Sequence, residues 1–471
     1  MTRLSQEPVE QYRFLASPLG LRLLEELSED GGRASSAQSR RLEAVLRDMA
    51  SELDPVALRL RIHDVLRARS KAAAKFGEAG AHSFLGDVAG VEQASGPRVA
   101  GYKAWRMSQL GVTAVVDLCC GVGGDARAFV ARFGADKVVA VDRDPAMSFV
   151  TEQASGCRVM VSDLDAANAA EAVAVLRNEV AASPTCVGVH IDPARRSGRQ
   201  RRGAAIADLE PCLEDCVDFA LLGDVGAIKL APGVDVRQLE SALRAMDRIA
   251  SYEVEWIAET EGLVQAVLWI EPRREATDFR GARATRMLSR VDEPESDRPR
   301  FASLTSTFAR DLQHDASGSW ASGSLDSMVG RLLVQPDPVL ERADLFDTWL
   351  REHGYEVMAI HPGLGLYSMA SDRRFESSGF EVFVARILAA LPWRPKKLRD
   401  YLASVDAHVT TYRTRGGAID RAEAERAIGK AALHSRSNRV VDVWGLRLGD
   451  RLVALVTESR VRSWPPSLES P

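Results

Sequence analysis

The chain has 471 residues, which is more than one ordinary domain holds and predicts two or three domains. Its hydrophobic content of 46% and charged content of 27% are typical of a globular protein, and no apolar run is long enough to span a bilayer. The net charge of −5, from 61 basic and 66 acidic residues, excludes a globally basic nucleic-acid binder, so any contact with nucleic acid must come from local patches.

Signals for secretion, disulfides and metals are lacking. The amino-terminal residues 1–7 have no apolar block of the kind that a signal peptide carries. The six cysteines are scattered without the paired spacing of a zinc site, which favours reduced thiols. We therefore expect a cytoplasmic protein with no membrane span and no metal, and the oligomeric state stays open.

The first 108 residues have the pattern of a helical domain. Apolar residues recur at helical spacing over residues 21–27 and 42–49, and a further amphipathic stretch covers residues 56–69. Four basic residues in this region either belong to solvated helix faces or lie near a bound nucleoside or a substrate phosphate: Lys71, Lys75, Lys103 and Arg106.

Residues 109–272 alternate between short apolar strands and helical segments. The predicted strands are residues 114–118, 137–142, 158–162, 186–191, 226–230, 252–258 and 264–270. The predicted helices are residues 125–133, 145–154, 168–182, 208–222 and 234–249. This alternation is typical of an α/β fold in which helices cover both faces of a parallel sheet. The last two strands have no helix between them, which predicts an antiparallel hairpin at one edge.

The rest of the chain divides into three parts. Residues 273–328 are rich in Arg, Asp, Ser and Pro and poor in apolar residues, which predicts an insertion or linker. Residues 329–462 carry further strand and helix patterns and close with a hairpin that turns at residues 449–450, which predicts an α/β domain. Residues 463–471 are predicted to be a tail.

One stretch, from Val115 to Asp142, organises the chain. An apolar run ends at Asp117, a turn with Gly121 and Gly123 follows, and a helical segment leads to a second apolar run that ends at Asp142. The glycines permit positive φ angles and let a ligand approach the backbone, while the helix directs unpaired N–H groups at the turn. An acid that ends the second strand can accept hydrogen bonds from both hydroxyls of a ribose. The stretch therefore predicts a nucleoside site at the carboxyl edge of the sheet.

The acid before the glycines distinguishes between two kinds of nucleoside. The turn is compatible with a dinucleotide-binding fingerprint, because that fingerprint tolerates alanine at its third glycine position, which Ala126 occupies. A carboxylate at Asp117 would instead repel a pyrophosphate and would suit the ammonium group of an amino-acid-bearing nucleoside. The pattern of Asp117, Gly121 and Gly123 resembles motif I of the class I S-adenosylmethionine-dependent methyltransferases. The resemblance implies a Rossmann-like sheet and S-adenosylmethionine as the methyl donor.

The resemblance also implies roles for single residues. The donor would be bound by Asp117, Cys119, Gly121 and Gly123, with Asp142 as the acid that binds the ribose. In this family an acid after the third strand commonly receives the adenine amino group, and that role falls on Asp163. The alternative for Asp163 is a cap for the helix that follows.

The fourth predicted strand leads into a second motif, with the sequence IDPARR. Methyltransferases that act on exocyclic nitrogens carry a similar Asp/Asn-Pro-Pro-aromatic motif, which holds the target amine. Here Asp192 and Pro193 match that motif, whereas Ala194 and Arg195 replace the second proline and the aromatic residue. We predict Asp192 and Pro193 as catalytic residues that orient or deprotonate the acceptor. Lys229, in an otherwise apolar strand, needs a partner, either Asp192 or a substrate phosphate, and is predicted to act with them.

A positive loop follows Asp192, with five arginines in eight positions: Arg195, Arg196, Arg199, Arg201 and Arg202. Arginine forks bind phosphates in a bidentate manner, and five arginines without interleaved acids would repel one another unless an anion lay among them. These residues are therefore predicted to bind the substrate, with RNA favoured over DNA. The alternative is a solvated charged loop.

The three motifs DLCCGVGGD, IDPARR and IKLAPG together resemble a bacterial methyltransferase family with a THUMP-like carboxyl-terminal domain. They are more distantly similar to the trimethylguanosine synthase type of RNA methyltransferase. THUMP domains bind RNA, and the resemblance implies a similar task for residues 329–462, which include a basic patch at residues 393–399. We therefore expect methylation of a base nitrogen in RNA, either tRNA or rRNA. Two alternatives stay open: a small-molecule methyltransferase, and a non-enzymatic RNA-binding protein that has kept the fold.

Overall fold

The computed structural model describes residues 3–28, 36–49, 52–179, 185–195, 206–246, 248–249, 251–259, 262–271, 280–288, 299–307, 325–361, 364–370, 379–433 and 437–458. The chain divides into two compact units: Met1–Gly281 with Met287–Phe301, and Ala282–Arg286 with Ala302–Pro471. Within the described ranges, no helix is both long enough and apolar enough to cross a membrane.

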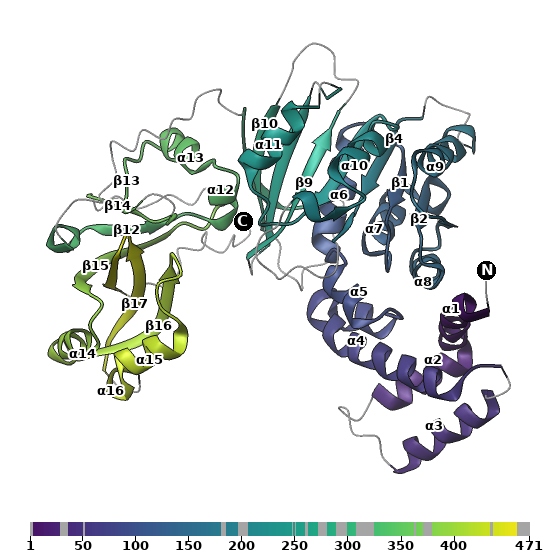
Figure 1. Cartoon of the computed structure of the whole chain (residues 1–471), viewed down its shortest axis with the longest axis horizontal. Coiled ribbons are helices and arrows are strands. Elements are labelled where there is room, and N and C mark those ends of the chain that lie inside the picture. The colour runs from purple at the N-terminus through teal and green to yellow at the C-terminus, as the bar shows by residue number, and fades with distance from the viewer. Residues whose placement is uncertain are drawn as a thin grey trace, which may run out of the picture. The chain divides into compact units, whose positions relative to one another are not determined.

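Helices precede the first strand, as the sequence pattern predicted (Figure 1). They are α1 (Arg3–Ala16), α2 (Pro18–Ser28), α3 (Ser36–Asp48), α4 (Pro55–His82), α5 (Val88–Gln93) and α6 (Pro97–Gln109). α4 bends at Gly77, whose φ of 72° is not helical. The apolar faces of α1–α4 share one core with Val122 of the glycine turn and with Ala146 and Val150 of α8 (Pro145–Ser155). The helical region therefore packs directly on the glycine turn and belongs to the same compact unit as the sheet.

The central sheet has the strand order β11-β10-β8-β9-β7-β4-β1-β2-β3. In chain order its strands are β1 (Ala114–Leu118), β2 (Val138–Asp142), β3 (Arg158–Val161), β4 (Val187–Ile191), β7 (Val225–Leu230), β8 (Tyr252–Glu259), β9 (Gly262–Ile270), β10 (Arg280–Met287) and β11 (Phe301–Thr307). β1, β2, β3, β4 and β7 run parallel, and β9 is antiparallel to both β7 and β8. The predicted antiparallel hairpin is confirmed. Its predicted place at the edge is wrong, because β10 and β11 extend the sheet beyond it.

The strands β10 and β11 lie within residues 273–328, where the composition predicted an insertion or linker, and that prediction missed them. The apolar signal of β10 is weak because its buried positions hold small residues and a paired arginine. Arg286 is 1% exposed and donates from Nε and Nη2 to the Asp337 carboxylate, which also caps α12 (Pro338–Arg342). A charged side chain with such a partner is buried without raising the hydrophobicity of the segment.

Helices cover both faces of the parallel strands (Figure 1). α6, α7 (Gly124–Phe133) and α8 pack against one another on one side, and α9 (Ala166–Glu179) and α10 (Leu213–Ala220) pack together on the other. α11 (Val236–Arg244) connects β7 to β8. α10 begins later than predicted, because β6 (Leu209–Glu210) pairs with β5 (Ala194–Arg195). All residues of β1 and β4 are buried, which explains why these strands are apolar apart from Asp117 and His190.

The second unit contains a seven-stranded sheet with the order β13-β14-β12-β15-β18-β17-β16. Its elements are β12 (Leu332–Gln335), α12, α13 (Phe346–Glu352), β13 (Met358–Ala359), β14 (Tyr367–Met369), β15 (Phe383–Pro392), α14 (Pro395–Ser404), β16 (Ala407–Arg415), α15 (Arg421–Ile428), α16 (Lys430–Leu433), β17 (Arg439–Leu448) and β18 (Arg451–Glu458). The predicted closing hairpin is β17 and β18. The sequence pattern predicts one helix over residues 337–353 and another over residues 420–433. Asp344 and Gly429, with φ of 56° and 85°, interrupt these two segments.

Candidate functional site

A cavity of about 850 Å³ opens at the carboxyl edge of the central sheet. It is called the donor cavity here, after the ligand that the sequence motifs predict for it. It is lined by residues at the ends of parallel strands or directly after them: 119–121 after β1, 142–143 at the end of β2, 162–164 after β3, 192–194 after β4 and 231–232 after β7. On the side of the helical region, Lys75 of α4 and several residues between Asp87 and Ser95 complete the wall. Residues far apart in sequence meet here because parallel strands end at the same edge.

The glycine turn after β1 has the left-handed backbone that its glycines predicted. Gly121 and Gly123 have φ angles of 54° and 78°, and Cys119 between β1 and the turn has 59°. A Cβ at Gly121 would meet nothing within 4 Å, whereas one at Gly123 would lie 3.0 Å from the Thr151 side chain. Thr151 of α8 also holds the turn, since its Oγ1 donates to the Gly121 carbonyl at 2.6 Å. The backbone at Gly121 is therefore open to a ligand.

Cys119 lines the donor cavity. Burial raises the pKa of its thiol, and nearby carboxylates, first Asp142, raise it further. The thiol therefore stays protonated and contributes shape rather than nucleophilic chemistry.

Asp142, at the end of β2, links the turn to the helix that follows. Its Oδ2 accepts from the Gly121 N–H at 2.8 Å, and its Oδ1 accepts from the Asp144 N–H at 2.9 Å. Each carboxylate oxygen can accept a second hydrogen bond, so the group can still receive a pair of hydroxyls. The cap of α8 is Asp144, which accepts from the Ala146 N–H at 2.8 Å.

For Asp163 the sequence left two roles open, and in the structure a different acid caps the following helix. α9 is capped by Asp165, whose Oδ1 accepts from the Asn168 N–H at 2.8 Å. Asp163 lines the donor cavity after β3, where its carboxylate can accept a hydrogen bond from a ligand. The capping role thus falls on a neighbouring acid.

Beneath the glycine turn lies a group of buried polar residues, here called the buried network: Ser95, Lys103, Asp117, Asp125 and His190. Lys103 Nζ is 2.7 Å from Asp125 Oδ1 and 3.1 Å from His190 Nε2. His190 Nδ1 is 2.7 Å from Asp117 Oδ1, and Ser95 Oγ donates to Asp125 Oδ2 at 2.8 Å. Because the Lys103 ammonium can only donate, His190 Nε2 must accept that hydrogen bond. The ring proton is therefore on Nδ1, which donates a hydrogen bond to Asp117.

Burial and pairing act in opposite directions on the pKa values of the buried network. Burial raises the pKa of Asp117, and the hydrogen bond from His190 opposes that rise. Burial would also raise the pKa of Asp125, but the charge of Lys103 holds it well below its usual range. Burial lowers the pKa of Lys103, and Asp125 acts against this effect.

One oxygen of the buried network has neither a hydrogen-bond partner nor an ion-pair partner in the described part of the chain. Asp117 is 1% exposed, lines the donor cavity, and its Oδ2 has no hydrogen-bond partner within the described part of the chain. A buried carboxylate oxygen without a donor costs about 1–3 kcal/mol or more. A ligand that brought a positively charged donor to this oxygen would recover that free energy, so the residues present fit an ammonium-bearing nucleoside.

At the other end of the donor cavity, Asp192 and Lys229 form an ion pair, one of the two partners that the sequence predicted for Lys229. Lys229 Nζ lies 2.6 Å from Asp192 Oδ2 and donates to the Gln93 carbonyl at 2.9 Å. Burial alone would lower the pKa of Lys229, but the charge of Asp192 raises it above the ordinary value. Pro193 and Ala194 also line the cavity. Of the predicted arginine loop, Arg195 is described in its backbone only, and Arg196, Arg199, Arg201 and Arg202 lie outside the described residues.

The four basic residues of the helical region have different surroundings. Lys75 lines the donor cavity, donates to the Val91 carbonyl at 2.7 Å, and has its pKa lowered by burial to about 8. Lys103 belongs to the buried network, Arg106 is buried against Glu253 and Glu255, and Lys71 pairs with Glu92 at the surface. Only the first of the four can touch a ligand in the donor cavity directly.

Sequence reasoning missed four residues that build the site: Ser95, Asp125, Thr151 and His190. A signal was present for His190, because a polar side chain within an otherwise apolar central strand must have a buried partner. Its partners could not be named, since they come from β1, α6 and α7. Among the described residues, no group of three or more His, Cys, Asp or Glu side chains is arranged to hold a metal.

The strand order β3-β2-β1-β4-β7-β9-β8, with the antiparallel β9 between β7 and β8, makes a Rossmann-like sheet. The solved structure of a candidate methyltransferase from Porphyromonas gingivalis W83 is similar to this chain with a TM-score of 0.60 and 16% identity. The match covers 97% of this chain and 99% of that one. At this identity the likeness shows the fold.

Other solved structures match smaller parts of the chain. A candidate RNA methyltransferase from Pyrococcus horikoshii matches 45% of this chain and 98% of its own, with 17% identity and a TM-score of 0.27. The N-terminal domain of human METTL16, solved with SAH, matches 37% of this chain and 69% of its own, with 10% identity and a TM-score of 0.27. No protein-family model matches the chain, and no curated protein matches its sequence.

Proposed function

We propose that the protein is an S-adenosylmethionine-dependent methyltransferase that modifies a base nitrogen in RNA. The observation that carries the proposal is the unpartnered Oδ2 of Asp117, which lies in the same cavity as the open backbone of Gly121. Asp117 would bind the donor's ammonium group, Asp142 its ribose hydroxyls and Asp163 its adenine amino group. When bound, the donor supplies a methyl group on a positively charged sulfur.

The acceptor would lie against Asp192, Pro193 and Lys229. Asp192 accepts a hydrogen bond from the target N–H and so directs the nitrogen lone pair at the methyl group, while Lys229 holds the carboxylate in place. The donor would supply its methyl group to the target nitrogen and leave as the neutral thioether, and Asp192 would take up the proton that the nitrogen loses and pass it to solvent. Because Lys229 fixes the position of the Asp192 carboxylate at 2.6 Å, the main contribution of this pair is alignment.

Positive charge near Asp192 supports a polyanionic acceptor. The arginine-rich segment 195–202 directly follows the proposed catalytic motif. The donor cavity itself is lined by more acidic than basic side chains, so the contacts to phosphate would come from that segment. Arginine pairs with phosphate in a bidentate manner. We extend the proposal to the second unit, whose resemblance to a THUMP domain implies that it presents tRNA or rRNA.

Two measurements test the proposed function. Titration calorimetry with S-adenosylmethionine, SAH and NAD should show binding of the first two and none of the third. Incubation with methyl-labelled donor and total RNA from cells that lack the protein should place the label on a base nitrogen. Label in small metabolites alone would identify a small-molecule methyltransferase. A folded protein that binds RNA but no donor would be a non-enzymatic binder, and binding of NAD would overturn the proposal.

A further inference from the structure

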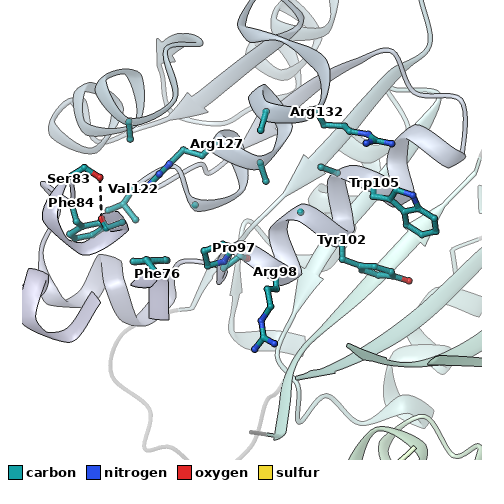
Figure 2. A pocket seen from close by; sticks show the side chains of 18 of the residues that line it. Phe76, Ser83, Phe84, Pro97, Arg98, Tyr102, Trp105, Val122, Arg127 and Arg132 are labelled. Atoms are coloured by element: carbon teal, nitrogen blue, oxygen red, sulfur yellow. Dashed lines mark hydrogen bonds between the residues drawn. The ribbon is translucent and has the colours of Figure 1, made fainter. Parts of the chain in front are cut away.

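A second cavity, of about 690 Å³, lies on the helical side of the glycine turn (Figure 2). Four aromatic residues contribute to its wall: Phe76, Phe84, Tyr102 and Trp105. Ser95, Val122 and Gly124 line both cavities. The second cavity is therefore separated from the donor cavity by little more than the glycine turn.

The charged residues that line the second cavity all have the same sign: Arg98, Arg127, Arg132 and Arg300. None of the described residues in its lining is acidic. Arg98 is 3.3 Å from Glu259, just outside the lining, and Arg132 donates to Ser108 Oγ. The exposed side chain of Arg127 has no ion-pair or hydrogen-bond partner within the described part of the chain. In a protein with a net charge of −5, this lining is suited to an anion.

The floor of the second cavity is formed by small residues on the facing helices α6 and α7: Gly101, Ala104, Ala128 and Ala131. A Cβ at Gly101 would meet nothing within 4 Å, so the open space extends to the helix backbone. Figure 2 shows Phe84 towards one end of the cavity and Trp105 and Arg132 towards the other. Tyr102 and Phe84 are 1% and 7% exposed and only close the wall. Flat apolar groups can therefore lie along the floor between Phe76 and Trp105, which are half-buried.

We propose that the second cavity binds a single-stranded segment of the RNA acceptor, an inference that rests on the proposed function. Single-stranded RNA combines bases that stack on aromatic rings with phosphates that pair with arginine. A fatty carboxylate would also match the apolar floor and the charge of Arg127, but it has no flat ring to stack on Phe76 or Trp105. RNA held in this place would run past the glycine turn and lead its target base towards Asp192.

Two pairs of variants test this site in the full-length protein. Gly101→Phe fills the floor of the cavity, and Gly101→Ala is its control, because it adds only a Cβ to open space. Arg127→Glu reverses the unpartnered charge, and Arg67→Glu is its control, because the Arg67 side chain is 74% exposed and lines neither cavity. Binding of a labelled single-stranded RNA of mixed sequence is measured by fluorescence anisotropy, and binding of S-adenosylmethionine by calorimetry.

We expect Gly101→Phe and Arg127→Glu to weaken RNA binding by about tenfold or more, with both controls within about twofold of the unmodified protein. Donor affinity should be unchanged in all four variants, which also shows that they fold. Unchanged RNA binding in both test variants, or no RNA binding by the unmodified protein, would overturn the second site. Binding of oleate that only Gly101→Phe abolishes, with RNA binding intact, would identify a lipid site instead. If the unmodified protein does not bind S-adenosylmethionine, the proposed function is contradicted. The RNA-binding measurements on the variants would still test the second cavity.

Discussion

Gly121 is the residue at which the donor cavity reaches the backbone, and a matched glycine elsewhere isolates its role. Gly121 and Gly111 both have left-handed φ angles, 54° and 83°, and in both a Cβ would meet nothing within 4 Å. Each change to alanine should therefore lower the free energy of unfolding by about 1–2 kcal/mol. Only Gly121→Ala places its methyl group in the donor cavity, so only this variant should weaken donor binding, by roughly tenfold. Calorimetry that finds equal donor affinity in both variants would contradict the assignment.

Asp192 is expected to act on the acceptor and not on the donor. Asp192→Ala should lower kcat by about 100-fold or more with unchanged donor affinity, because it removes the group that orients the target nitrogen. Asp192→Asn should keep part of the activity, since an amide oxygen still accepts from the target N–H. The control is Asp165→Ala, which removes the cap of α9 and should cost about 1 kcal/mol of stability without a change in kcat. Lost donor affinity in Asp192→Ala would mean that this side chain is misplaced.

At the scale of elements, Lys103 joins α6 to α7 and to β4 through Asp125 and His190. Lys103→Met would leave Asp125 as a buried charge without its main partner. The variant should lose about 3–5 kcal/mol of stability in urea unfolding. Lys71→Met removes a surface pair with Glu92 and should change stability by less than about 1 kcal/mol. Similar stability of the two variants would mean that the buried network does not hold these elements together.

Lys75 of α4 makes stability depend on pH, because burial lowers its pKa from 10.5 to about 8. A lysine whose pKa is lower in the folded state destabilises the protein fully below pH 8, and the effect vanishes as the pH rises towards 10.5. Lys75→Met removes this effect along with the hydrogen bonds to Val91 and Glu92. The melting temperature of the variant, relative to the unmodified protein, should therefore fall as the pH rises from 8 to 10.5. A difference that is constant over this range would show that Lys75 is not desolvated.

At the scale of the whole molecule, the negative net charge opposes the binding of RNA. A chain with a net charge of −5 repels RNA on average, so affinity must come from local arginines and should fall steeply with salt. Replacement of Arg199, Arg201 and Arg202 by glutamine should reduce the slope of log affinity against log salt by about 0.7 for each phosphate that these arginines neutralise. Arg67→Gln is the control and should leave the slope unchanged. An unaltered slope in the triple variant would remove the arginine loop from the RNA site.

The predicted fold agreed with the structure where the sequence pattern is local. The alternation over residues 114–270 predicted the five parallel strands and the antiparallel hairpin, because strands buried on both faces must be continuously apolar. The same rule failed for β10, whose buried positions include Arg286 and small residues. Helical periodicity likewise predicted single helices where Asp344 and Gly429 interrupt them. One left-handed residue changes the chain direction without changing the hydrophobic pattern.

The sequence by itself determined the ligand edge of this protein. Asp117, Gly121 and Asp142 belong to one strand-turn-helix-strand unit, so their chemistry and their meeting place follow from short-range geometry. Only the tertiary structure decided which charges lie behind that edge. Lys103 and His190 meet Asp117 and Asp125 through packing of α6 and β4 against the turn, and the cavity beside Arg127 exists because small residues on two helices face each other. Such contacts depend on how whole elements pack, and neither periodicity nor motif spacing carries that information.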